Sequence, residues 1–511
     1  MSITRRDFVR AAVVSGAAAS GVALAPGRAL ARAFAADRER LPSPLAQPSP
    51  SRGPASRPVT TGSQEPVIPS WVLDVDGNGT VNTDDRRAIE ASLGAARGLE
   101  ISPRPGYDFR ADLLARGEVT AADLQAFDAH AMPGPATPRP VVICWHYGWY
   151  HPRRRLLERP TASYLGGDYN SDDPATEEQF NALKHEFGIS AELLSWIDEP
   201  GGEGFDPPLI NYARGYFSAT SVRTRQFGWL YETAINLRIA DRVGLGYRTG
   251  RRQRLVEHFQ SMARMMLDES GALAANVLRI EGRPVIYMFA SHLLGTGVGS
   301  LTGVALALSE ARQAFIAEAG VAPYLIGDEA LFLGDPDIDQ ARRFRAGFFD
   351  AITRYHHYDL ELVAAFAADG PVHLGGDYLD VILANEARTR AAFASLRNRF
   401  TGNPLLVLPS SAAGFAKVGL PTLLATREDY AKLLRAMLAI TEEHLREDHG
   451  DRFGTPALPA APVIVGSWNE EFEGHALFPA RANEAMVGDR FGGFEWLAAI
   501  KEVFGWNKQT L

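Results

Sequence analysis

The chain of 511 residues contains a single cysteine, Cys144. One cysteine cannot form an intramolecular disulfide, so the folded state has to be stabilised by its apolar core and not by covalent cross-links. The composition allows this, because 46% of the residues are hydrophobic and 22% are charged, as in ordinary globular proteins.

A concentrated basic region is also missing. The formal net charge is −9, and no Lys- or Arg-rich block interrupts the body of the chain. Nucleic-acid binding requires clustered cations that neutralise successive phosphates. We therefore expect no nucleic-acid partner.

The apolar stretch nearest the N-terminus, residues 11–25, is too short and too rich in Ala, Gly and Ser to span the ~30 Å hydrocarbon core of a membrane. It follows a twin-arginine pattern at residues 4–9 (TRRDFV) and precedes a small-x-small cleavage pattern at residues 29–31. We interpret residues 1–31 as a twin-arginine signal peptide. The mature protein is then periplasmic or extracellular, with no membrane span.

Residues 32–70 are rich in Pro and Ser, and between 41 and 70 hardly any bulky apolar residue occurs before Val67. Such a segment cannot bury enough apolar surface to offset its conformational entropy. We expect it to be a disordered linker.

Residues 74–85 (DVDGNGTVNTDD) match the pattern of an EF-hand calcium loop. Such a loop needs side-chain oxygens at its first, third, fifth and twelfth positions, a tight turn at the sixth and a backbone carbonyl at the seventh. The alternative is an Asx-rich turn that holds no ion. The calcium ligands expected from the pattern are Asp74, Asp76, Asn78, Thr80 and Asp85.

The Asp at the twelfth position and the Val-Asn pair at 81–82 resemble a dockerin repeat. A second repeat over residues 112–123 has Leu114 and Arg116 where calcium ligands are needed. The pair at 83–84 (TD) matches the cohesin-contact hydroxyl pair of dockerins only in part. We therefore expect residues 71–132 to form a small α-helical, dockerin-like module with one structural calcium, and we favour this over a module that binds a cohesin-type partner.

From residue 138 onward, eight short apolar segments alternate with amphipathic helical ones. The segments are apolar on both faces, as are the strands of a buried parallel sheet. Eight such units over about 370 residues predict a (β/α)8 TIM barrel at 138–508. An open doubly wound sheet is the alternative, but no glycine-rich phosphate loop follows the first segment. The segments are 140–147, 188–196, 226–232, 283–290, 322–328, 348–355, 404–410 and 461–468.

Aromatic and acidic residues follow these strands, at the end where a barrel carries its active site. Aromatic rings stack on sugar rings and carboxylates accept hydrogen bonds from hydroxyls, so we expect a poly- or oligosaccharide substrate. No catalytic metal is expected, because the adjacent His356 and His357 point to opposite sides of a strand. The expected substrate-binding residues are His146, Tyr147, Trp149, Tyr150, Trp196, Asp198, Glu232, Glu329, Tyr355, Trp468 and Asn469.

Glycoside cleavage needs two carboxyl groups, one of which can donate a proton. Residues 466–474 (GSWNEEFEG) place three glutamates after the last strand. In a helical turn, Glu470 and Glu473 share one face and Glu471 points elsewhere. We predict that Glu470 and Glu473 are the catalytic pair. The alternative is that they are solvated surface residues.

The pattern SWNExxEG at 467–474, followed by Pro-Ala at 479–480, resembles the strand-8 signature of glycoside hydrolase family 99, the endo-α-mannosidases. The segments 149–150 (WY), 167–174 (GDYNSDDP), 194–196 (LSW) and 283–287 (RPVIY) also resemble that family. The resemblance covers roughly residues 140–480 and implies substrate contacts by Tyr169 and Tyr287.

The resemblance also implies a retaining mechanism without a covalent enzyme intermediate. Glu470 would act as base on the 2-hydroxyl of the substrate, giving a 1,2-anhydro sugar, and Glu473 would be the acid/base at the glycosidic oxygen.

The chain departs from the family at residues 471–472 (EF), where the family has Trp-His, and at Phe478, where it has Glu. These positions touch the sugar subsites and leave the mannose specificity open. Alternatives are another α-glycan hydrolase such as an α-1,3-glucanase-like enzyme, a non-catalytic carbohydrate-binding barrel, or a family-99-like glycosyl-transfer protein. Both glutamates are retained, which favours catalysis, and export argues against a nucleotide-sugar donor.

Overall fold

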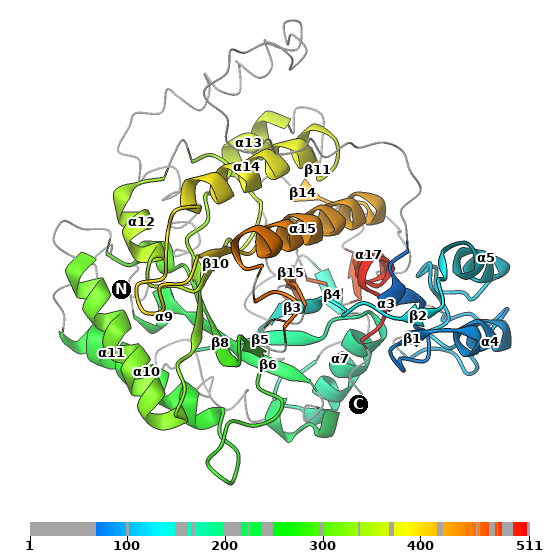
Figure 1. Ribbon diagram of the computed structural model, residues 1–511, viewed down its shortest axis with the longest axis horizontal. Coiled ribbons are helices and arrows are strands. Elements are labelled where there is room, and N and C mark those ends of the chain that lie inside the picture. Colours follow the sequence, from blue (N-terminus) through cyan, green and yellow to red (C-terminus); the bar gives the residue numbers. More distant parts are fainter. Residues whose placement is uncertain are drawn as a thin grey trace, which may run out of the picture.

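The computed structural model consists of a small helical module packed against a large α/β barrel (Figure 1). The predicted signal peptide, and the predicted linker as far as residue 67, lie outside the described residues. The residues that the structure describes are 68–98, 102–148, 162–164, 169–197, 216–221, 225–237, 249–295, 301–335, 338–366, 372–415, 423–450, 452–455, 458, 460–469, 476–477, 479–482 and 494–507.

Eight parallel strands form the barrel sheet in the order in which they occur in the chain. The last strand pairs with the first, and Ser410 forms a parallel bridge with Ile464, so the sheet closes on itself. The predicted (β/α)8 barrel is confirmed, with all eight of its strands. They are β3 (Val141–His146), β5 (Ala191–Trp196), β6 (Gln226–Glu232), β8 (Arg283–Phe289), β9 (Tyr324–Asp328), β10 (Ala351–Thr353), β12 (Leu406–Val407) and β15 (Pro462–Ser467).

Helices surround the sheet (Figure 1). They are α7 (Pro174–Glu186), α9 (Thr233–Asn236), α10 (Thr249–Met265), α11 (Leu301–Ala319), α12 (Gln340–Ala346), α13 (Leu360–Phe366), α14 (Asp377–Phe393), α15 (Arg427–Asp448) and α17 (Glu495–Phe504). Helix α14 ends at Phe393. A turn follows it, in which the Asn398 side-chain oxygen accepts the N–H groups of Phe400 and Thr401.

Short elements lie between these units. Strand β4 (Ala162–Tyr164) pairs with β16 (Ala480–Ala482), and β7 (Arg279–Ile280) pairs with β8. A three-stranded sheet contains β11 (Val372–His373), β14 (Leu423–Leu424) and β13 (Gly414–Phe415). The 3-10 helix η4 (Ser291–Leu293) follows β8.

The barrel strands are apolar on both faces because both faces are covered. Trp229 and Ile286 point outward and pack in one core with Phe259 of α10. Leu230 and Tyr287, their neighbours on the same strands, belong to a second core that includes the interior of the barrel. This explains why the strands read as continuous apolar runs and not as alternating patterns.

The N-terminal module is built from two helices that each follow a similar loop. Helices α4 (Thr83–Ala91) and α5 (Ala121–His130) both begin with a capping box, in which an N-cap side chain and an Asp three residues later bond each other's backbone. The module also contains α3 (Ser70–Leu73) and the strands β1 (Thr80–Val81) and β2 (Gly134–Pro135). It has its own small apolar core around Val81, Ile89 and Val119.

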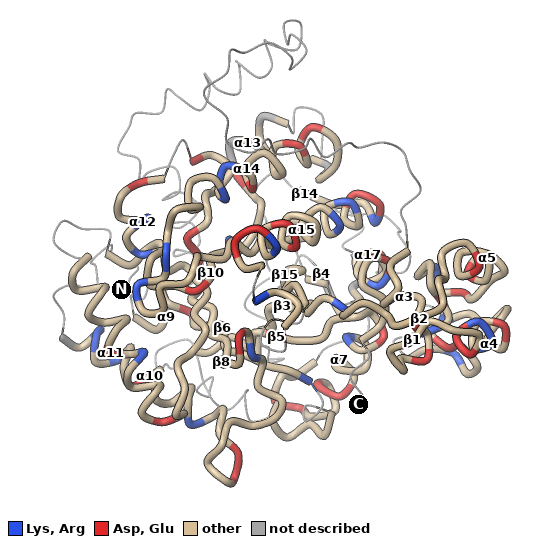
Figure 2. Tube along the Cα trace, in the orientation of Figure 1, with Lys and Arg blue, Asp and Glu red and all other residues tan. Residues whose placement is uncertain are grey.

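Charges of both signs are interspersed over the described chain, including helices α4 and α15 (Figure 2). In the same residues, no helix is both long and apolar enough to cross a membrane.

We predict that Gly188→Ala destabilises the barrel strongly. Gly188, between α7 and β5, has a φ of +82°, and an added Cβ would lie 1.9 Å from the carbonyl oxygen of Gly505. Left-handed strain and overpacking together should cost roughly 3 kcal/mol of unfolding free energy. Gly402→Ala is the matched control, because Gly402 has a φ of +73° but no atom within 4 Å of the added Cβ. Equal losses in thermal unfolding would contradict the assigned contact between residues 188 and 505.

Candidate active site

Aromatic side chains from several strands meet inside the barrel. The Trp145 ring of β3 stacks 6.0 Å from the Tyr287 ring of β8 and lies 4.7 Å from the ring of Tyr355, which follows β10. The hydroxyl oxygens of Tyr147 and Tyr355 are 2.5 Å apart. Alternate residues of a strand share one face, so Trp145 and Tyr147 both point into the interior.

Two buried carboxylates lie at the carboxyl ends of β6 and β9, on the same wall of the barrel. The Ser195 hydroxyl donates to Glu232, at the end of β6, over 3.2 Å. Asp328, at the end of β9, accepts the N–H of Ala290 through Oδ2 at 3.0 Å. In the parallel register, Tyr287 pairs with Leu230 and Ile326, each two residues before one of these carboxylates. Glu232, Tyr287 and Asp328 therefore point to the same side of the sheet.

Burial, reinforced by the charge of Asp328, raises the pKa of Tyr287 well above its ordinary value, so the phenol stays protonated. The Tyr287 hydroxyl and Asp328 Oδ1 are buried and form no hydrogen bond with described residues. Buried polar groups in native proteins are nearly always hydrogen-bonded. A donor and an acceptor inside the barrel can thus bind hydroxyl groups.

Asn469 fixes the end of the last strand beside the first. Its Oδ1 accepts the N–H of Tyr147, and its Nδ2 donates to the carbonyl oxygen of Tyr147, both at 2.8 Å. Its Nδ2 also donates to the Tyr169 hydroxyl at 3.3 Å. The register between β15 and β3 shifts between Ile464 and Ser467, and Gly466 adopts a φ of 100° in this irregular segment.

The structure brings some of the predicted site residues together. Tyr147, Glu232, Tyr287 and Tyr355 belong to the interior group, and Asn469 and Tyr169 lie beside Tyr147. Trp149, Tyr150, Asp198, Glu470 and Glu473 lie outside the described residues.

Trp196 and Glu329 lie instead on the outer face of the barrel wall, among helix residues. The Trp196 ring packs 4.6 Å from His258 of α10. Glu329 accepts hydrogen bonds from Arg345 of α12 at 3.0 Å and from Ser291 at 2.9 Å. The inward carboxylate at the end of β9 is Asp328, which the sequence analysis did not select. The sequence carries no signal for it, because the side that Asp328 takes follows from the register of β9 with Tyr287 of β8.

His146 and Trp468 also face outward, toward α7. His146 Nδ1 is 2.7 Å from Glu192 Oε2, and Lys184 of α7 forms a buried ion pair with the same carboxylate. The Lys184 ammonium lies 5.0 Å from the centre of the Trp468 ring. Tyr216 donates to Glu192 Oε1 at 2.7 Å. This cluster connects α7 to the end of the last strand.

The charges in this cluster are set by burial. Burial, together with the Lys184 ammonium, lowers the pKa of His146 to about 4. Burial raises the pKa of Glu177, whose Oε1 is 3.6 Å from His146 Nε2, to about 8. Burial alone would raise the pKa of Glu192, but Lys184 and His146 hold it well below its ordinary value. Near neutral pH, His146 and Glu177 are therefore neutral and Glu192 is charged.

A group of carboxylates suited to a cation lies in the N-terminal module. One ligand oxygen from each of Asp74, Asp76 and Asp85 lies within 4.8 Å of the other two. Burial, with the nearby charges of Asp76 and Asp74, raises the pKa of Asp85. Hard oxygen donors crowded in this way are the donor set that calcium prefers. Among the described residues this is the one such group found, and it matches the predicted loop.

Comparisons with known proteins found similar solved structures. A GH99 endo-α-mannosidase from Bacteroides thetaiotaomicron, in complex with bis-tris-propane, is 15% identical with a TM-score of 0.45, covering 71% of this chain and 96% of that chain. A glycoside hydrolase-like protein is 15% identical with a TM-score of 0.49, covering 72% and 94%. A GH26 β-mannanase from Bacteroides ovatus is 10% identical with a TM-score of 0.34, covering 73% and 93%. No protein-family model and no curated protein matches the sequence.

We predict that Glu177→Gln stabilises the protein in a pH-dependent way. The wild-type Glu177 carboxyl is protonated in the folded protein, but in the unfolded chain it ionises above its ordinary pKa of 4.5. The folded state therefore loses stability as the pH rises from 4.5 to about 8. The Gln variant has no carboxyl to ionise, so its stability does not fall in this way. The difference in unfolding free energy between the variant and the wild type should grow by about 1 kcal/mol per pH unit over that window, to a few kcal/mol.

Urea unfolding of both proteins at pH 5.5 and pH 8.5 measures the effect. Glu178→Gln is the control of opposite sign. Burial opposes the ionisation of Glu178, but hydrogen bonds from Ser221 and Thr220 lower its pKa. Removing the Glu178 carboxylate should therefore lower the unfolding free energy at both pH values. A Glu177→Gln advantage that is the same at both pH values would show that Glu177 is ionised in the fold.

Proposed function

We propose that this chain is an exported glycoside hydrolase that cleaves α-linked glycans, with an endo-α-mannosidase-like, retaining mechanism. The observation that carries the proposal is the position of Asn469 at the carboxyl end of β15, joined to Tyr147 by two hydrogen bonds. Active sites of such barrels lie at this end of the strands. Glu470 follows Asn469 in the sequence, and Glu473 is three residues further on.

The interior group supports a carbohydrate as the substrate. The rings of Trp145, Tyr355 and Phe289 lie 4.7 Å apart in successive pairs. Trp145 and Tyr355 are buried, and Phe289 is partly exposed and offers the face on which a sugar ring would stack. The neutral Tyr287 phenol offers a donor, and Glu232 and Asp328 offer acceptors for sugar hydroxyls. A few polar groups placed on an aromatic wall are typical of small-ligand sites.

In the proposed mechanism, Glu470 removes the proton of the 2-hydroxyl while Glu473 protonates the glycosidic oxygen. The bond from C1 to the leaving oxygen breaks, and the 2-oxygen bonds to C1 from the opposite face, giving a 1,2-anhydro sugar. Water then attacks C1 and loses its proton to Glu473, and Glu470 returns its proton to the 2-oxygen. Two inversions at C1 give net retention.

We predict that Glu470→Gln and Glu473→Gln each lower kcat on yeast α-mannan by roughly 10²–10⁴-fold, because a positioned acid or base contributes that much. Glu471→Gln is the matched control in the same segment and should keep the wild-type rate. Equal activities of the three variants, measured as released reducing ends, would overturn the assignment. A parallel screen on α-glucans identifies the glycan.

A conventional two-carboxylate glycosidase is the second candidate, and the inward position of Glu232 favours it. In that case Glu232 would be the nucleophile and its change to Gln would lower kcat as much as Glu473→Gln does. In the proposed mechanism Glu232 contacts substrate hydroxyls, and Glu232→Gln should mainly raise KM. The split between kcat and KM distinguishes the two.

We propose that the loop at 74–85 holds one structural calcium ion without a catalytic role. Asp74→Asn should abolish the single calcium-binding event in calorimetry, because the ion loses a charged ligand. Asp84→Asn is the control, since Asp84 lies in the same loop but pairs with Arg87 at the surface. Two binding events in the wild type would contradict the proposal.

A further inference from the structure

The second loop of the module keeps the backbone of a calcium loop although it lacks the ligands. The N–H of Leu114 donates to Asp123 at 3.0 Å, as the N–H of Asp76 donates to Asp85 at 3.0 Å in the first loop. The N–H of Gly117 donates to Asp112 at 2.9 Å, and its equivalent in the first loop, between residues 79 and 74, is 3.1 Å long.

The backbone angles of the two loops agree as well. Gly77 and Ala115, at the fourth position of each loop, both have positive φ, 75° and 49°. Left-handed conformation is unfavourable for alanine by about 1 kcal/mol or more. The second loop therefore holds its shape against local strain, and something other than calcium must balance its buried carboxylates.

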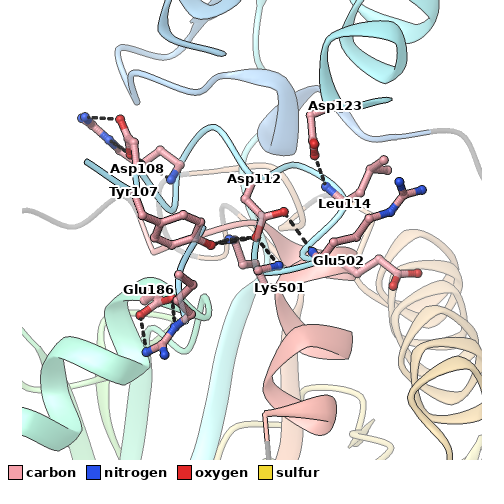
Figure 3. A network of polar contacts seen from close by, with 12 residues as sticks. Tyr107, Asp108, Asp112, Leu114, Asp123, Glu186, Lys501 and Glu502 are labelled. Atoms are coloured by element: carbon pink, nitrogen blue, oxygen red, sulfur yellow. Dashed lines mark hydrogen bonds and ion pairs between the residues drawn. The ribbon is translucent and has the colours of Figure 1, made fainter. Parts of the chain in front are cut away.

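A lysine from the far end of the chain lies against the first carboxylate of this loop (Figure 3). Lys501 Nζ is 3.3 Å from Asp112 Oδ2 and 3.3 Å from the Tyr107 hydroxyl, which itself donates to Asp112 Oδ2 at 2.7 Å. Lys501 is 3% exposed and Asp112 is 2% exposed. The two residues are 389 positions apart, and Lys501 belongs to α17, the last helix of the barrel.

We propose that the Lys501 ammonium is the built-in cation of the second loop, takes the place of a calcium ion there, and fixes the module permanently to the barrel. This inference does not depend on the proposed glycosidase activity. A compact monovalent cation on a flexible stem can reach a buried carboxylate that has too few oxygen neighbours to bind a metal ion.

Other contacts around this ion pair also join the module to the barrel. Arg97 of the module binds Glu186 of α7 through two hydrogen bonds of 2.6 and 3.0 Å, and both side chains are buried. The Arg97 guanidinium also lies 4.1 Å from the ring centre of Phe494. Arg427 of α15 donates to the carbonyl oxygen of Leu114 at 2.6 Å. Two cations of the barrel, Lys501 and Arg427, therefore reach the second loop, and Arg97 of the module reaches a carboxylate of the barrel.

These contacts fix how the module packs on the barrel. The start of the second loop, around Asp112 and Leu114, therefore lies against α15 and α17, and Arg97 beside it is bound to α7. Buried ion pairs are weak sources of net stability but strongly destabilising when one partner is removed. Such a pair fixes how two parts of a chain pack.

The test is a double-mutant cycle on the full mature chain with Lys501→Met, Asp112→Asn and both together. Each single variant should lower the Tm by roughly 5 °C or more, because it leaves one buried partner uncompensated. The double variant should recover at least half of that loss. Lys432→Met, an exposed lysine on α15, is the control and should leave the Tm unchanged. Unchanged single variants, or a double variant with fully additive losses, would overturn the proposal.

Calcium titration gives an independent readout that does not require the variants to be equally stable. Wild type and Lys501→Met should show the same number of binding events, because the second loop still lacks ligands at Leu114 and Arg116. An additional event in Lys501→Met, abolished by Asp112→Asn, would show that the second loop is a metal site that the lysine merely blocks.

Discussion

The two hydrogen bonds between Asn469 and the backbone of Tyr147 close the barrel where its first and last strands meet. They fix the end of β15 after a register shift, and Gly466 allows this shift because its φ of 100° is unfavourable for other residues. The N–H of Trp468 adds a bond of 2.6 Å to the carbonyl oxygen of Trp145. Behind this closure, Trp468 is packed against the buried Lys184 of α7.

Buried polar groups lie on both faces of the barrel wall. On the outer face, Glu329 is bound by Arg345, and Arg354 lies 3.0 Å from Glu386 of α14. These buried charges pair with each other across helices and strands. On the inner face, the Tyr287 hydroxyl and Asp328 Oδ1 form no hydrogen bond with described residues. Because burying an unbonded polar group costs free energy, we propose that these two atoms bind substrate hydroxyls.

The eight strands could be predicted from the sequence because strands covered on both faces read as short continuous apolar runs. The approach of the Asp74, Asp76 and Asp85 carboxylates to one another could be predicted because their spacing is fixed within twelve residues. The direction of side chains could not be predicted so well. The sequence predicts Glu329 as the site residue after β9, whereas Asp328 faces inward. Two adjacent carboxylates look equivalent until the neighbouring strand fixes which one faces inward. The contact between Lys501 and Asp112 joins residues 389 positions apart, and no local pattern reports it.

We propose that the barrel cleaves an α-glycan through participation of the 2-hydroxyl of the sugar. The most direct test is proton NMR of the first product formed from an α-mannan oligosaccharide, run beside the same substrate without its reacting 2-hydroxyl. The account predicts that the α-anomer forms first and that the 2-deoxy substrate is not turned over. Initial release of the β-anomer, or hydrolysis of the 2-deoxy substrate at a comparable rate, would contradict it.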